Sequence, residues 1–169
     1  MPASGIRVID DRDEYHNNSD GFGGGDGSVI ENSYFDTWDD TFKIYNGDLT
    51  VRNTTVLHNG NGAPVQMAGG DYGHGTLIAD GLKVVSHSRN HYNQGVFSWA
   101  GGTKSDSPTV KLTGRGLIRS TPAGMRTGPL YVWNGYDLPF SPRRIIACAP
   151  PGVPAEQPPL VDSGTGSCR

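Results

Sequence analysis

Residues 17–45 read NNSDGFGGGDGSVIENSYFDTWDDTFKIY, and two similar segments stand near the ends of this stretch. Ser-Asp-Gly-Phe occupies positions 19–22, and Asp-Asp-Thr-Phe occupies positions 39–42, twenty residues later. Hydrogen-bonded strands lie about 4.8 Å apart, so a chain that coils back after one such period stacks the two segments. The period therefore predicts that Asp20, Asp39 and Asp40 meet in one surface patch.

Four segments share a layout of an apolar run, a turn-forming residue and a second apolar run. They are residues 29–35, 49–57, 77–85 and 110–118, and their centres are Asn32, Asn53, Asp80 and Gly114. Gly, Asn and Asp tolerate a left-handed backbone better than other residues do. We expect one such residue in each segment to bend the strand sharply without ending its pairing.

A second series of short strands alternates with the first along the chain. It comprises residues 42–45, 65–67, 96–99 and 130–133, in which alternate side chains are apolar, as in a strand with one buried face. The resulting repeat of about 20 to 34 residues predicts an all-β fold, a right-handed parallel β-helix over residues 1–140. An antiparallel sandwich or barrel is the alternative, because Asn46-Gly47 and Asn134-Gly135 are hairpin signals.

Composition agrees with many short strands in a single domain. The chain has 169 residues, of which 25 are Gly and 12 are Pro, the two poorest helix formers. The formal net charge of −3 gives no basic footprint for nucleic acid. Apolar runs are too short to cross a membrane, and the polar N-terminal stretch does not resemble a signal peptide. We therefore expect neither nucleic acid nor membrane as a partner.

The two ends of the chain differ from its middle. Residues 141–169 are rich in Pro and Gly and predict an irregular tail, in which Cys148 and Cys168 either pair or stay as free thiols. Residues before 17 offer little material to cap a first coil, and an open coil end exposes unpaired backbone. We therefore expect a homo-oligomer that forms through the exposed first coil.

Clustered carboxylates predict acid–base chemistry. Like charges raise at least one pKa, which leaves a protonated acid beside an ionised base, as glycosidic bond hydrolysis requires. Trp38 is placed to stack on a sugar ring, and Lys43 to contact sugar hydroxyls or to tune the carboxylates. Asp-Asp is also a common structural turn sequence, in which Asp caps the local backbone. The cysteines lie far from the histidines, so no metal site and no cofactor are expected.

These residues resemble a known family of enzymes. Ser19-Asp20-Gly21-Phe22, followed by residues 29–45 with their Asp-Asp-x-x-Lys-x-Tyr pattern, resembles the catalytic segment of glycoside hydrolase family 49, the dextranases and isopullulanases. The likeness covers about residues 17–69, the C-terminal part of the family's β-helix, and residues 49–53 and 63–65 look like its next coil. The family's N-terminal β-sandwich and earlier coils have no counterpart here, so the resemblance implies a shortened cleft, in which activity is either kept or lost.

The resemblance implies a pectin-lyase-like solenoid that cleaves an α-glucan, such as dextran with its α-1,6 linkages, with inversion. Asp39 then resembles the general acid, and Asp20 and Asp40 resemble the pair that activates water. The family is typically secreted. The further residues expected to contact the polysaccharide are Trp38, Lys43, Tyr45, His58, Asn59, Gln66 and His74.

Two other functions remain open from the sequence. Polygalacturonases carry Asn-Thr-Asp, Asp-Asp and Gly-His-Gly, to which Asn18-Ser19-Asp20, Asp39-Asp40 and Gly73-His74-Gly75 are similar, although no Arg-Ile-Lys follows. The chain is alternatively a non-catalytic module that binds carbohydrate or assembles with itself.

Overall fold

Two parallel β-sheets make up the protein in the computed structural model. The residues that the structure describes are 2–12, 19–44, 47–59, 63–69, 75–86, 96–100, 109–120, 131–134 and 145–146. Within these ranges every regular element is a β-strand, and every strand pairing is parallel. The all-β prediction is confirmed, and the antiparallel alternative is wrong for the described residues.

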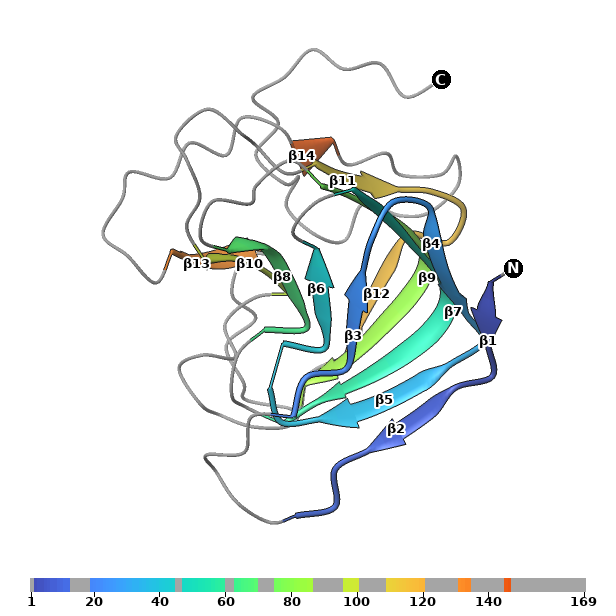
Figure 1. The fold of residues 1–169 in the computed structure, drawn as a ribbon, viewed down its shortest axis with the longest axis vertical. Helices are drawn as coiled ribbons and strands as arrows, with labels where there is room; N and C mark the ends of the chain where they lie inside the picture. Colours follow the sequence, from blue (N-terminus) through green and yellow to red (C-terminus); the bar gives the residue numbers. More distant parts are fainter. Residues whose placement is uncertain are drawn as a thin grey trace.

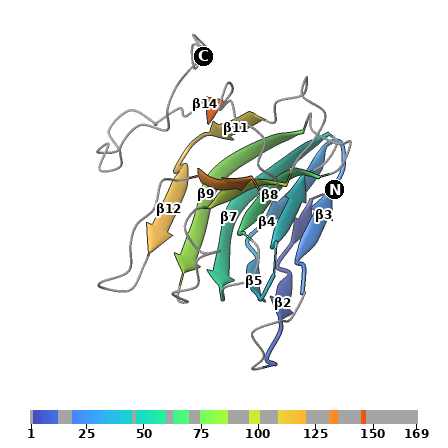
Figure 2. The ribbon, with the colours of Figure 1, turned by 90° about the vertical axis from the view of Figure 1, so that its left-hand side faces the viewer.

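The larger sheet has nine strands and the smaller has five. The larger sheet contains β1 (Ala3–Ser4), β2 (Arg7–Ile9), β4 (Ser28–Glu31), β5 (Tyr34–Thr37), β7 (Asp48–His58), β9 (Thr76–Ser86), β11 (Thr109–Leu112), β12 (Leu117–Ser120) and β14 (Ile145–Ile146). The smaller sheet contains β3 (Phe22–Gly24), β6 (Phe42–Ile44), β8 (Val65–Gly69), β10 (Phe97–Ala100) and β13 (Tyr131–Asn134). The chain passes between the sheets repeatedly, and the two sheets face one another (Figures 1 and 2).

Apolar side chains stack in columns between the sheets. Phe42 pairs with Val65, which pairs with Phe97 across the smaller sheet, and all three are at most 1% exposed. Phe35 projects from the larger sheet and meets Phe42 edge-on, with ring centroids 5.1 Å apart. Burying one such side chain fully contributes about 1.5–3 kcal/mol. The first three members of the second predicted strand series are thus confirmed as strands of the smaller sheet with core-facing side chains.

Left-handed residues bend the strands of the larger sheet. Asn32 has a φ of 51° and Asn53 a φ of 43°, as predicted. The predicted position of the third bend is wrong by one residue. Arg52 pairs with Asp80, so Gly81, which has a φ of 74°, lies opposite Asn53.

The fourth bend is longer than predicted. Leu112 pairs with Ala79 and Leu117 with Leu82, so four residues here replace two in the preceding strand. Gly116, with a φ of 60°, takes the bend position, while the predicted Gly114, with a φ of 53°, lies inside the widened turn.

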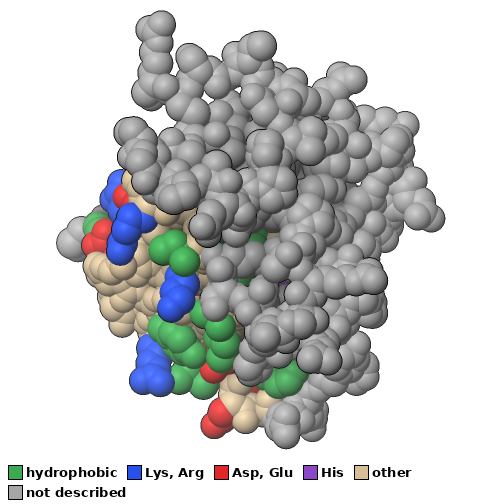
Figure 3. Space-filling model, turned by 180° about the vertical axis from the view of Figure 1, so that it is seen from behind, with side chains coloured by type: hydrophobic (Ala, Val, Ile, Leu, Met, Phe, Trp, Pro, Cys, Tyr) green, Lys and Arg blue, Asp and Glu red, His purple; other side chains and the backbone are tan. Residues whose placement is uncertain are grey.

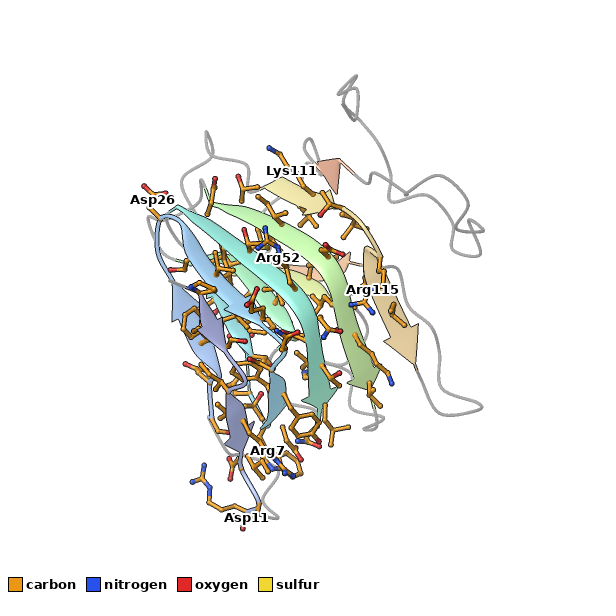
Figure 4. The ribbon with its side chains drawn as sticks, turned by 90° about the vertical axis from the view of Figure 1, so that its right-hand side faces the viewer. Arg7, Asp11, Asp26, Arg52, Lys111 and Arg115 are labelled. Carbon is orange, nitrogen blue, oxygen red and sulfur yellow. The ribbon has the colours of Figure 1, made fainter. Side chains whose placement is uncertain are left out.

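A row of polar side chains links these bends on the outer face of the larger sheet. The Asn53 amide donates to Asn32 Oδ1 at 2.8 Å, and the Asn32 amide donates to Ser4 Oγ at 3.3 Å. Arg115 crosses Gly81 and donates to Asn53 Oδ1 at 2.8 Å. Figure 4 shows Arg115 on the same face as Arg52. We call Ser4, Asn32, Asn53 and Arg115 the bend ladder.

The N-terminal segment, which was expected to offer little material to cap a first coil, contributes two strands to the larger sheet. β1 pairs with β4 and β2 pairs with β5, in the same parallel sense as the later strands. Gly5, with a φ of 69°, lies at the bend position next to Asn32, and Ile6 and Val8 pack against the core. The alternation of apolar and polar side chains in β1 and β2 covers too few residues to identify these strands from the sequence.

The C-terminal segment joins the larger sheet at one point. β14 lies beyond residue 140, in the predicted irregular tail, and pairs with β11. Cys148 and Cys168 lie outside the described residues, so their pairing stays open. No helix in the described part of the chain is long and apolar enough to cross a membrane.

The face seen in Figure 3 carries separate Lys and Arg side chains with hydrophobic groups between them. A nucleic-acid-binding face usually has its basic groups clustered or aligned in a stripe. The absence of a nucleic-acid partner stays a prediction.

Candidate active site

Strand register brings the two acidic segments together. Phe22 pairs with Phe42, as the twenty-residue period predicts, and Asp20 precedes β3 while Asp39 and Asp40 precede β6. The Phe22 N–H donates to the Thr41 carbonyl at 2.7 Å. One oxygen of each of the three carboxylates lies within 4.8 Å of the other two. The predicted proximity is confirmed, and we call Asp20, Asp39 and Asp40 the carboxylate cluster.

Gly21 makes this close approach possible. A Cβ at position 21 would lie 2.5 Å from the Thr41 carbonyl oxygen and 3.0 Å from the Phe35 ring. Real Cβ atoms do not approach backbone that closely, so any larger residue would push the Asp20 segment away from Asp40. The small residue between the acid and the aromatic is therefore a steric requirement of the cluster.

Lys43 supplies a positive charge to the carboxylate cluster from β6. Its Nζ lies 2.8 Å from Asp20 Oδ2 and 3.6 Å from Asp40 Oδ2. Its side chain is 23% exposed, while those of Asp20 and Asp40 are 48% and 12% exposed. One ammonium among three carboxylates leaves an excess of negative charge, which favours uptake of a proton.

The carboxyl groups of Asp39 and Asp40 both hold a proton more tightly than a free aspartate does. Burial raises the pKa of Asp40 to about 6, with a further rise from the nearby charge of Asp39, against the hydrogen bond from the Ala63 N–H and the charge of Lys43. Burial, and then the charge of Asp20, also raise the pKa of Asp39. Because the two groups are adjacent, the titration belongs to the pair.

Backbone hydrogen bonds hold the pair in place. The Ala63 N–H donates to Asp40 Oδ1 at 2.9 Å, and the Asp40 N–H donates to Asp39 Oδ1 at 2.5 Å. Beneath them the buried hydroxyls of Thr37 and Thr41 are 2.7 Å apart. Asp40 is buried. Asp39, which is more exposed, is the better placed of the two to meet a substrate.

Two of the expected contact residues surround the cluster. Trp38 is half-buried, and its backbone N–H donates to Ser19 Oγ at 3.0 Å. Gln66 is half-buried on β8 and pairs with Lys43, the position expected for it one period later. Tyr45 and His74 lie outside the described residues.

His58 and Asn59 do not face the surface. Alternation through β7 puts His58 on the same side as Val56, and His58 is 0% exposed. Asn59 is 4% exposed, and its amide donates to Asp36 Oδ1 at 2.7 Å and to the Thr37 carbonyl at 3.0 Å. A sugar cannot reach either side chain in this position, so the expectation of substrate contact is not carried further. The even spacing from Val56 was the signal that could have shown this for His58.

The carboxylate cluster is also the one group of acidic, His or Cys side chains among the described residues with the spacing of a metal site. Oxygen ligands of this kind suit Mg²⁺ or Ca²⁺. Here the Lys43 ammonium already lies 2.8 Å from Asp20. The Lys43 ammonium would therefore repel a cation bound at that place.

Sequence reasoning missed Asp10 and Ser19. Asp10 follows β2, was given no role in the sequence analysis, and has a side chain that is only 6% exposed. Ser19 was quoted in the motif without a role. The Arg12 guanidinium that donates to Asp10 lies only two residues along the chain, whereas the Trp38 N–H that donates to Ser19 lies 19 residues away.

Comparison with known proteins leaves the site to be interpreted from its own geometry. No family model matches the chain, and the searches of curated proteins and of solved structures likewise found no match.

Proposed function

We propose that this protein is a glycoside hydrolase that cleaves an α-glucan, with dextran-like α-1,6 linkages as the first substrate to test. The observation that carries the proposal is the carboxylate cluster, in which two acids with raised pKa values lie beside a third acid paired with Lys43. Hydrolysis of a glycosidic bond needs one protonated and one ionised carboxyl group. The choice of α-glucan rests on the resemblance to family 49.

The proposed scaffold is a right-handed parallel β-helix of the pectin-lyase-like kind. It is supported by the regular passage of the chain between two parallel sheets. Parallel strands joined by a crossover are right-handed in about 98% of cases, which supports the handedness.

Exposure and charge suggest how the roles divide. Asp39 donates the proton to the leaving oxygen, because it is the more exposed member of the pair with raised pKa values. Asp20 and Asp40 orient and activate the water. Lys43 holds the Asp20 carboxylate in the cluster through the 2.8 Å ion pair. Trp38, which precedes Asp39, and Gln66, which pairs with Lys43, are the contacts for neighbouring sugar units.

Release of reducing ends from dextran and pullulan between pH 4 and 8 tests the proposal. Asp39→Asn is the inactive control, and Asp11→Asn, at an exposed position outside the cluster, is the matched active control. Hydrolysis of polygalacturonate, measured in the same way, tests the pectinase alternative. A folded sample that releases sugar from none of these substrates would overturn the catalytic proposal, and glucan binding without release would identify a carbohydrate-binding module.

The stereochemical course is a separate part of the proposal. Inverting enzymes hold their two carboxyl groups about 6.5–9.5 Å apart and retaining enzymes about 5–5.5 Å apart. The resemblance favours inversion, whereas the approach of single oxygens to within 4.8 Å favours retention. Proton NMR of the first product decides between them, because inversion at an α-linkage releases the β-anomer and retention releases the α-anomer.

A further inference from the structure

Buried polar side chains gather at two places among the described residues. One place is the bend of the larger sheet, where Ser33 and Thr54 follow the left-handed Asn32 and Asn53. The other place is the connection from β5 to β6 together with the end of β7, and its members are Thr37, Asp40, Thr41, His58 and Asn59. A polar group in the interior costs free energy unless it is hydrogen-bonded, so the contacts of the second group show what it holds.

Asn59 directly follows β7 and attaches to the end of β5. Its side-chain amide donates to Asp36 Oδ1 at 2.7 Å and to the Thr37 carbonyl at 3.0 Å. A primary amide has two N–H donors, so it has one for each of these acceptors. Thr37 is the last residue of β5. We call residues 38–41, which connect β5 with β6 and carry two acids of the carboxylate cluster, the acid turn. Asn59 therefore binds the point at which the chain enters the acid turn.

The connection from β7 to β8, which begins with Asn59, also holds the far end of the acid turn. The Ala63 N–H donates to Asp40 Oδ1 at 2.9 Å, and the Ala63 carbonyl accepts from the Thr41 N–H at 3.2 Å. The Pro64 carbonyl accepts from the Phe42 N–H at 3.0 Å. The acid turn is thus bound at its entrance by a side chain and at its exit by the backbone.

One peptide group at the entrance is held from both sides. The carbonyl of the peptide that joins Thr37 to Trp38 accepts from Asn59, and its N–H donates to Ser19 Oγ at 3.0 Å. A peptide group is planar, so these two bonds fix its orientation and with it the direction in which Asp39 follows. Water can replace the half-buried Ser19 hydroxyl, whereas Asn59 is buried, and loss of its amide leaves a buried carbonyl without this donor.

We propose that Asn59 is a positioning residue of the candidate site, which fixes the entrance of the acid turn through the Thr37 carbonyl and so sets the places of Trp38 and Asp39. This inference rests on the proposed function for its kinetic consequences, but not for its structural ones. Asn59 is buried and does not itself touch the substrate. When its amide is removed, the acid turn moves outward and Asp40 becomes less buried.

The test compares Asn59→Ala with Ser33→Ala, a matched control at the other end of β5. Ser33 is also buried and also makes two side-chain hydrogen bonds, from the Ile6 N–H at 3.1 Å and to the Glu31 carbonyl at 2.7 Å. We expect both variants to lower the melting temperature. Carbon-13 NMR of labelled aspartate carboxyls should show a fall in the pKa of Asp40 from about 6 toward 3.8 in Asn59→Ala alone, because burial is the main cause that raises it.

Kinetics supply the second readout. A misplacement of about 1 Å costs on the order of 100-fold in rate, so kcat for dextran should fall by about 10- to 100-fold in Asn59→Ala, with KM little changed, and should be unchanged in Ser33→Ala. Asp36→Ala is a milder variant, which removes one partner of the Asn59 amide and keeps the Thr37 bond. It should shift the Asp40 titration in the same direction by less, and it carries the test if Asn59→Ala does not fold.

Two results would overturn the positioning role. One is an unchanged Asp40 titration in folded Asn59→Ala and Asp36→Ala. The other is an equal shift in Ser33→Ala, which would indicate general loosening of the fold. An inactive wild-type protein whose Asp40 titration still shifts in Asn59→Ala alone would refute the proposed function and leave the positioning role of Asn59 intact.

Discussion

The carboxylate cluster and the bend ladder are both rows of polar side chains from successive strands, yet they are built on opposite principles. In the bend ladder every contact joins a donor to an acceptor, from Arg115 through Asn53 and Asn32 to Ser4. In the carboxylate cluster three acids share one lysine, and burial raises the pKa of two of them.

The difference separates scaffold from candidate site. Complementary side chains stabilise the stack, and their replacement should cost stability alone. Like charges in close contact destabilise the folded state and persist only where the surrounding structure holds them. Replacing such a group should therefore reduce activity while leaving stability unchanged or higher.

Among the variants that test this difference, Asp39→Asn is expected to have the largest effect, and that effect is on activity. Loss of the proton donor should lower the hydrolysis rate by about 10²–10⁴-fold, while the melting temperature stays near that of the wild type. Dextran hydrolysis and thermal unfolding, measured with Asp11→Asn in parallel, check both parts. A fully active variant would remove Asp39 from the mechanism.

Gly21→Ala tests whether sterics bring the acids together. The added Cβ meets the Thr41 carbonyl oxygen at 2.5 Å, and overpacking of this kind costs about 1–3 kcal/mol. Gly23→Ala is the matched control, because a Cβ at Gly23 has nothing within 4 Å. Urea unfolding should separate the two variants clearly. Equal stability would show that the close approach at Gly21 does not constrain the segment.

Asp40→Asn should stabilise the protein in a pH-dependent way. The folded pKa of about 6 lies above the ordinary 3.8, so the folded state binds the proton more tightly. The wild type therefore loses stability as the pH rises from about 4 to about 6, by up to about 3 kcal/mol, whereas asparagine does not titrate.

The stability difference between Asp40→Asn and wild type should thus be near zero at pH 4 and greatest above pH 6. Unfolding free energies measured from pH 4 to 8 check this. An advantage that is the same at every pH would mean that proton binding is not its source.

Asn53→Ala should have the smallest effect on stability and, in contrast to Asp40→Asn, should destabilise the folded protein. Alanine lacks the side-chain bonds to Asn32 and Arg115 and is strained at a φ of 43°, which together should cost about 1–2 kcal/mol. Asn53→Gly keeps the backbone freedom and loses only the side-chain bonds, so its cost should be lower. If the two variants are equally stable, the backbone conformation at this bend contributes little.

Much of the strand pattern was predictable because it is local. Alternating apolar residues identified β6, β8, β10 and β13, and the period between Phe22 and Phe42 predicted their register. The bend residues Asn32 and Asn53 were also correct. The third and fourth bends were misplaced, because Asp80 and Gly81 are both plausible bend residues and the widened turn around Gly114 has no local marker.

The sequence predicted the three acids at the centre of the candidate site but not the residues around them. The three acids share one period and could be aligned without a structure. Ser19 could not be assigned a role, since the N–H that donates to its hydroxyl belongs to Trp38, 19 residues away. His58 and Asn59 were expected to contact the polysaccharide, although they lie in the interior.

The sequence by itself determined the strand periodicity, the positions of Asn32 and Asn53, and the grouping of three acids, because each depends on spacing along the chain. Only the tertiary structure decided that Gly81 and Gly116 occupy the later bends, that β1 and β2 pair with β4 and β5, and that Asp40 is buried beside Lys43. Those features depend on which strands lie side by side. Burial and charge, which set the pKa values of the acids, arise only when distant segments meet.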